Sequence, residues 1–124
     1  FLERAVVSCF EMPPLRALKK ADPRLPVGVI LSAVQGDATR LPIDFLSVHQ
    51  RLARGDLVRR AHQRGQQVHV WGVSDRETAL RLLDLGCDNL ITPDPELIRE
   101  VVDDYASLGD LERMLLRLRR WLRE

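Results

Sequence analysis

Five short apolar runs, rich in β-branched residues, recur about every 22 residues, with one shorter interval of about 18. The runs are Ala5–Phe10, Val27–Leu31, Phe45–Val48, Val68–Val73 and Asn89–Thr92. Uninterrupted apolar runs of this length are typical of strands buried on both faces, as in a parallel sheet. Because strand and helix patterns alternate at this period, the sequence predicts right-handed βαβ units. Either a doubly wound sheet or a piece of a (β/α)8 barrel would contain them.

Helical patterns lie between most of these runs. The expected helices span about 14–21 and 56–63, then one follows a cap at Ser74 or Asp75, and another starts at Pro95. Gly65 and Gly86 are expected to end the second and third helices, as glycines commonly do. The segment 33–42 is small and polar and has no helical pattern.

The last stretch predicts an amphipathic helix from about Leu108 to Leu122, capped by Ser107. Its apolar stripe consists of Leu111, Met114, Leu115, Leu118, Trp121 and Leu122. Arginines line the other faces of the helix. Three interpretations are open: a helix packed on the domain, a partner-binding helix, or a basic helix lying on a membrane surface.

Composition excludes several classes of protein. A chain of 124 residues is one domain or part of a larger one, and 45% apolar with 30% charged residues is globular composition. The net charge of +1 gives no argument for nucleic acid or an anionic membrane. No apolar run is long enough to span a bilayer, and no signal peptide is recognisable. Because the first residue is Phe1, we expect a processed product, a fragment or part of something longer.

The two cysteines, Cys9 and Cys87, each lie beside or within an apolar run. We expect buried, reduced thiols, as in a cytoplasmic domain, with a disulfide between them as the alternative. No Cys-x-x-Cys or Cys/His spacing is present, so a structural zinc site is not expected.

Few residues of the sequence suggest a catalytic, metal-ligating or ligand-binding role. His49 ends the third apolar run, at the carboxyl edge where barrels hold their active sites; a solvent-exposed histidine is the alternative. His62 is expected at a helix surface, and His69 in a structural role, pointing outward under a helix. Asp75 and Asp94 are expected to cap helices. The sequence contains neither a metal-type carboxylate spacing nor a glycine-rich phosphate loop.

Motifs over about 40 residues carry a resemblance to a known family. They include Ala61-His-Gln-Arg-Gly65, Val68-His-Val-Trp-Gly-Val73, Leu85-Gly-Cys-Asp88 and Leu90-Ile-Thr-Pro-Asp94. Their order and spacing resemble the C-terminal part of a glycerophosphodiester phosphodiesterase domain. Upstream, Ser8 and Phe10 resemble the family's Ser-Phe strand, so the resemblance covers 5–102.

The resemblance implies a TIM-type (β/α)8 barrel, of which this chain supplies about five β/α units. It also implies a hydrolase of lipid and glycerol metabolism that cleaves glycerophosphodiesters to sn-glycerol 3-phosphate and an alcohol. Such phosphoric diester hydrolases use two histidines and a divalent metal, Ca or Mg, held by carboxylates. These motifs lie on the family's first strands and have no match here, so we expect no catalytic residue or metal ligand and an inactive isolated chain. The alternatives are a non-catalytic half-barrel for binding or assembly, or another phosphate-handling barrel.

Four residues are carried over as candidate substrate contacts: Trp71, Phe10, Ser8 and His49. Trp71 matches the family's tryptophan, whose ring lines the substrate pocket; a barrel-core role is the alternative. The sequence departs from the family pattern at Gly72, Ser74 and Pro93, where Thr, Asn and Asp are usual.

We expect residues 1–105 to form the C-terminal part of the barrel and 106–124 the amphipathic helix. Five strands cannot close an eight-stranded barrel, and open sheet edges favour further pairing. The expected partners are therefore a small-molecule glycerophosphodiester and either a second copy or a missing N-terminal half, with no nucleic acid. A cytoplasmic location is expected, although a membrane-attached parent is compatible.

Overall fold

The computed structural model describes residues 2–33 and 36–123, in which five strands form one parallel sheet. The strands are β1 (Val7–Cys9), β2 (Val27–Leu31), β3 (Phe45–His49), β4 (Gln67–Trp71) and β5 (Asn89–Leu90). Their spatial order is their chain order. A doubly wound sheet reverses its strand order at a switch point, whereas a barrel adds strands consecutively. The observed order is therefore that of a barrel segment.

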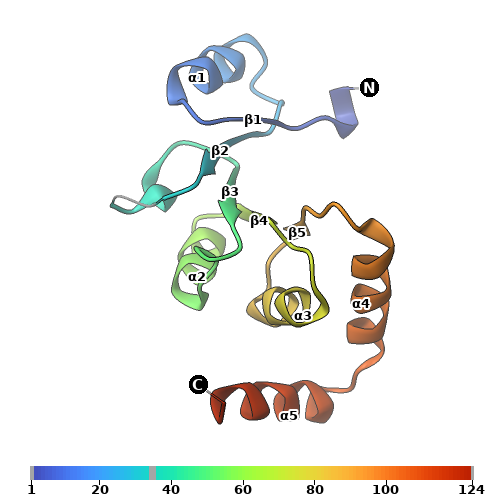
Figure 1. Cartoon of the computed structure of the whole chain (residues 1–124). Helices are drawn as coiled ribbons and strands as arrows, with labels where there is room; N and C mark the ends of the chain where they lie inside the picture. Colours follow the sequence, from blue (N-terminus) through green and yellow to red (C-terminus); the bar gives the residue numbers. More distant parts are fainter. Residues whose placement is uncertain (1, 34–35, 124) are drawn as a thin grey trace.

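Within the described residues, five α-helices accompany the strands, together with two short 3-10 turns. The helices are α1 (Met12–Ala21), α2 (Gly55–Gln63), α3 (Arg76–Leu85), α4 (Pro95–Ser107) and α5 (Asp110–Trp121), and the turns are η1 (Leu2–Arg4) and η2 (Ala38–Arg40). Figure 1 shows α1 to α4 following chain order around the outside of the curved sheet, with α5 crossing beneath α3. The predicted alternation of strand and helix is confirmed.

Local signals in the sequence explain where the helices begin and end. Asp75 accepts the Thr78 N–H at 2.8 Å at the start of α3, and Asp94 accepts the Leu97 N–H at 3.1 Å at the start of α4. Gly86 ends α3 with φ +83, a left-handed conformation that costs other residues more. These predicted caps and the predicted stop are confirmed.

The predicted cap at Ser107 is wrong. Ser107 is the last residue of α4, and its hydroxyl donates to the Asp104 carbonyl at 2.7 Å. A serine in a final helical turn can satisfy a carbonyl of its own helix, so it need not start the next one. Gly109 caps α5 instead, because the Glu112 carboxylate reaches back to accept its N–H at 2.9 Å.

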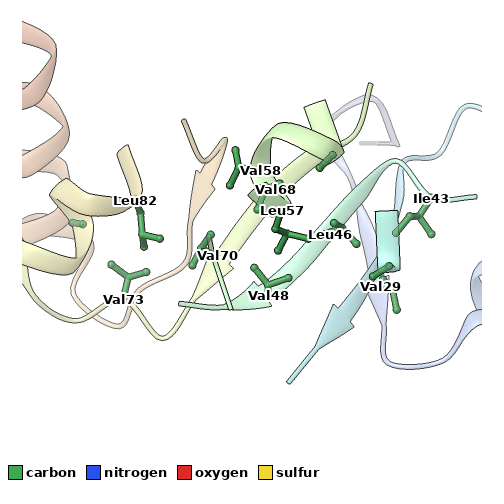
Figure 2. Packing of buried hydrophobic residues seen from close by; sticks show 14 of the residues in the cluster. Val29, Ile43, Leu46, Val48, Leu57, Val58, Val68, Val70, Val73 and Leu82 are labelled. Atoms are coloured by element: carbon green, nitrogen blue, oxygen red, sulfur yellow. The ribbon is translucent and has the colours of Figure 1, made fainter. Parts of the chain in front are cut away.

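The core lies between the sheet and helices α1 to α4. Alternate residues of the strands point to this side, including Val29, Leu46, Val48, Val68 and Val70, and they pack against Leu57, Val58 and Leu82 of the helices (Figure 2). The four central strand residues of this set are 0% exposed. Their burial supplies the main free energy that holds the helices on the sheet.

An aspartate ahead of β3 links three elements. The Asp44 N–H donates to the Val27 carbonyl at 2.8 Å, and its carboxylate accepts the Val27 N–H at 2.8 Å. The same carboxylate oxygen pairs with Lys19 of α1 at 2.7 Å. Asp44 therefore fixes the register of β2 and β3 and ties α1 to both strands.

Asp88, ahead of β5, repeats this arrangement. Its N–H donates to the Val68 carbonyl at 2.9 Å, and its carboxylate accepts the Val68 N–H at 2.7 Å. Here the partner is His62 of α2, the helix before β4, and its Nε2 lies 2.8 Å from the carboxylate. The expectation that His62 lies at a helix surface is confirmed, because its side chain is exposed on α2. The loop after Gly86 supplies this exposed side chain with a partner, the Asp88 carboxylate.

Helix α5 is attached through its arginines. The Asp84 side chain on α3, only 4% exposed, accepts the Arg117 Nε at 2.7 Å and a second bond from Arg120. Tyr105 of α4 donates to the same carboxylate at 3.1 Å. The helix thus packs on the domain by its polar side, and its apolar stripe faces outward.

We predict that Gly28→Ala destabilises the chain by about 1–3 kcal/mol, because overpacking at this site has nowhere to relax. A Cβ at Gly28 would lie 2.2 Å from the Phe45 ring. Gly55→Ala is the matched control: its Cβ would meet only Leu85, at 3.6 Å. Urea unfolding of both variants measures the effect, and equal midpoints would contradict the prediction.

We predict that Asp84→Asn releases α5 while leaving the sheet intact. Burial by itself would raise the pKa of Asp84, but hydrogen bonds from Arg117 and Arg120 outweigh it and hold the pKa below its usual value. Because the pKa is lower in the folded chain, ionised Asp84 stabilises the fold at pH values above the unfolded-state pKa of about 3.9. This stabilisation is lost as the pH falls through the folded-state pKa. Wild-type α5 should therefore also loosen in acid.

Amide hydrogen exchange measures this release, with faster exchange expected over 110–121 and unchanged exchange in β3 and β4. Asp103→Asn, an exposed carboxylate on α4, is the control. Unchanged exchange of α5 in Asp84→Asn would show that the arginines do not hold it.

Candidate functional site

One face of the sheet carries no helix of the described chain. Strand register places Ser8 opposite Gly28, Gly28 opposite Phe45, and Phe45 opposite Gln67. Since side chains alternate along each strand, Ser47, His49, His69 and Trp71 share this face. In a barrel this is the inner face, and its carboxyl end is where active sites form.

An aromatic pair occupies the middle of this face. The Phe45 ring covers Gly28 and stacks on His69, with ring centroids 4.3 Å apart and planes 17° apart. The His69 Nε2 lies 3.0 Å from the Gln67 side-chain oxygen. Burial lowers the pKa of His69, which favours the neutral imidazole.

His69 has a structural role, but the prediction that it lies under a helix is wrong. Val68 and Val70 take the helix side, so alternation turns His69 to the opposite face.

A second pair lies where β3 and β4 end. His49 is opposite Trp71 in the register, and the two rings meet edge to face with centroids 4.6 Å apart. The Arg51 N–H donates to the His49 Nδ1 at 3.2 Å, which leaves the proton of the neutral imidazole on Nε2. The Trp71 Nε1 is buried and finds no acceptor among the described residues. Two N–H groups thus lie at the carboxyl end of the sheet, and the buried one of Trp71 has no partner among the described residues.

Gly72 allows this arrangement. It has φ +77, and a Cβ there would lie 2.8 Å from the His49 Nε2. Any other residue would be strained in this conformation and would displace the His49 ring. The left-handed conformation of Gly72 and the position of the His49 ring are therefore coupled.

The other two candidate contacts lie apart from this pair. Ser8 is on β1 and Phe10 follows it, with β2 and β3 between them and Trp71. Both are exposed, and Phe10 is 68% exposed. The structure brings His49 and Trp71 together and places Ser8 and Phe10 at the far edge of the same face.

The described residues offer little other chemistry. Cys9 and Cys87 are free thiols, so the alternative of a disulfide between them is wrong. Burial raises the pKa of Cys87 to about 11, which keeps it protonated at neutral pH. Within 2–33 and 36–123, no three His, Cys, Asp or Glu side chains gather closely enough to hold a metal ion. The residues present therefore do not fit the metal that the resemblance implies.

In the same described ranges, every helix is too short or too polar to cross a membrane.

Comparison with known proteins agrees with this architecture. Residues 2–97 match the model of the glycerophosphoryl diester phosphodiesterase family. A glycerophosphodiester phosphodiesterase of Caldanaerobacter subterraneus is 29% identical over 106 residues, covering 82% of this chain and 44% of that protein. Such a match, added to the consecutive parallel sheet, defines the class: part of a phosphodiesterase-type TIM barrel.

Solved structures show the same fold. A glycerophosphodiester phosphodiesterase from Parabacteroides distasonis superposes with a TM-score of 0.76 at 20% identity, over 86% of this chain and 46% of that one. An Oleispira antarctica phosphodiesterase, solved with the product sn-glycerol-3-phosphate, gives 0.71 at 24% identity, over 79% and 41%. This chain belongs to the glycerophosphoryl diester phosphodiesterase family. It spans less than half the length of these three relatives.

We predict that stability falls between pH 7 and pH 5 in part because of His69. Its pKa is lowered by burial, so the unfolded chain binds the proton more tightly than the folded chain. Stability is therefore lost as the pH falls below the unfolded value of about 6.5. His69→Phe keeps the stack on Phe45 but cannot titrate, so its urea midpoint should fall less over this range. An identical fall in both proteins would exclude His69 as a cause.

Proposed function

We propose that the complete protein hydrolyses glycerophosphodiesters to sn-glycerol 3-phosphate and an alcohol, and that this chain supplies the second part of the barrel. The family match over residues 2–97 carries the proposal. The product bound to the Oleispira antarctica phosphodiesterase supports the same substrate class. A cytoplasmic location is part of the proposal and is supported by the two free thiols.

In this proposal, the residues described here bind substrate and leave bond cleavage to the rest of the barrel. The edge-on contact of His49 with Trp71 leaves two N–H donors, which suit the oxygens of a phosphate or glycerol. The Trp71 ring adds an apolar wall for the glycerol backbone or leaving group. Ser8 and Phe10 are proposed to line the opposite side of the same mouth.

Catalytic histidines and the divalent metal, Ca or Mg, are proposed to belong to the first half of the complete barrel. That half would also cover the helix-free face of the sheet and pair with the open edges of β1 and β5. The isolated chain is accordingly expected to be inactive.

A non-catalytic half-barrel for binding or assembly is the second candidate. The exposed apolar stripe on α5 favours it, because large exposed apolar patches mark interaction sites.

Release of sn-glycerol 3-phosphate from glycerophosphocholine tests the proposal. The complete protein should show turnover that a chelator abolishes and Ca or Mg restores, whereas the 124-residue chain should show none. In the complete protein, Trp71→Ala should lower kcat/KM by about tenfold or more, since a lost wall contact and a lost donor each cost about 1 kcal/mol or more.

Trp71→Phe, which keeps the wall without the N–H, should fall between wild type and Trp71→Ala. Arg59→Ala, on the exposed side of α2, is the control and should leave kcat/KM unchanged. A complete protein without turnover would favour the half-barrel alternative, and full activity in Trp71→Ala would remove Trp71 from the pocket.

A further inference from the structure

Helix α5 exposes a continuous apolar stripe to solvent. The stripe consists of Leu111, Met114, Leu115, Leu118, Trp121 and Leu122, each between 49% and 70% exposed. Five large apolar side chains on the 12-residue helix, with Leu122 at its C-cap, form a patch on the order of a few hundred Å², the range in which exposed patches mark interaction sites. No residue of α5 is buried.

The domain holds α5 by the opposite side of the helix. Arg117 and Arg120 bind the buried Asp84 carboxylate, and Arg113 lies over the Tyr105 ring, 4.7 Å from its centroid. Polar anchoring fixes the helix with its leucines turned outward. The family match ends at residue 97, so this stripe lies outside the shared part of the barrel.

The spacing of the stripe is that of a helix-pairing seam. Leu111, Met114, Leu118 and Trp121 follow the 3-4-3 spacing of the a and d positions of two heptads. Leu115 and Leu122 widen the seam on one side by occupying the two e positions. A partner helix with the same spacing would bury all six side chains.

Charge along α5 is polarised. Asp110 and Glu112 lie in the first turn, and Arg119, Arg120 and Arg123 lie at or just beyond the last. Arg113, Arg117 and Arg120 are held by the domain, so the remaining charge of α5 is acidic in the first turn and basic at the end, whereas an anionic membrane would favour basic residues along the whole helix. An antiparallel second copy complements both ends, because each acidic end meets a basic end and the helix dipoles oppose.

We propose that the α5 stripe pairs with α5 of a second copy of this chain, antiparallel and about a two-fold axis. With the axis between Leu115 and Leu118, Leu111 meets the partner's Leu122, and Glu112 lies on the same flank of the contact as the partner's Arg119. The contact is smaller than the roughly 800 Å² per partner of a standard interface, so the dimer is reversible. This inference does not depend on the proposed hydrolysis.

Sedimentation velocity of the 124-residue chain over a concentration series tests the pairing. Wild type should show a monomer–dimer equilibrium, and Leu115→Glu with Leu118→Glu should be monomeric. Both leucines are about half exposed, so the far-UV circular dichroism should stay unchanged. Phe10→Glu, on the helix-free sheet face, is the matched control and should still dimerise.

A charge exchange tests the orientation. Glu112→Arg alone and Arg119→Glu alone should each raise the dimer dissociation constant several-fold at low salt. The two changes in one chain should restore it, because each end again meets the opposite charge.

Several outcomes would overturn the proposal. A wild-type chain that stays monomeric at every concentration would do so. Dimers lost in Phe10→Glu but kept in the double leucine variant would place association on the open sheet instead. Binding to phosphatidylglycerol vesicles without any self-association would identify the stripe as a membrane-surface helix.

Discussion

Two aspartates hold the sheet in register. Asp44 and Asp88 each exchange two hydrogen bonds with the first or second residue of the preceding strand and bind a basic side chain of the helix before that strand. The two arrangements lie two β/α units apart and use different partners, Lys19 and His62. Because each links a helix and two strands, the alternating pattern becomes one arc with a defined curvature and two distinct faces.

The outer and inner faces of the sheet have different surroundings. The outer face is dry and packed against α1 to α4, with Leu46 and Val68 fully buried. The inner face has no helix in the described chain, yet Phe45 and His69 are nearly buried there because they stack on each other over Gly28. Because the Phe45–His69 stack occupies the middle of the inner face, His49 and Trp71 line the carboxyl end of the sheet. A barrel that lacks strands thus still presents an ordered inner surface.

The orientation of α5 follows from a single buried carboxylate. Asp84 lies on α3 with 4% of its side chain exposed, and a buried charge needs charged partners. Arg117 and Arg120 supply them, which turns the opposite, apolar side of α5 to solvent. An amphipathic helix ordinarily packs its apolar side on the domain and turns its charged side to solvent, which is the reverse of what α5 does. The surface that this creates is the one for which pairing with a second copy is proposed.

The sequence by itself determined the strands, the helices and the family, because its signals are local: apolar runs at a fixed period, caps such as Asp75, and motifs around Trp71. Only the tertiary structure decided which side chains share a face. Alternation sorts a strand's residues into two sets but does not say which set meets helices, so His69 was assigned to the wrong side. A stripe on a helix does not say whether a core covers it. Contacts distant in sequence, such as Asp84 with Arg117, decide that.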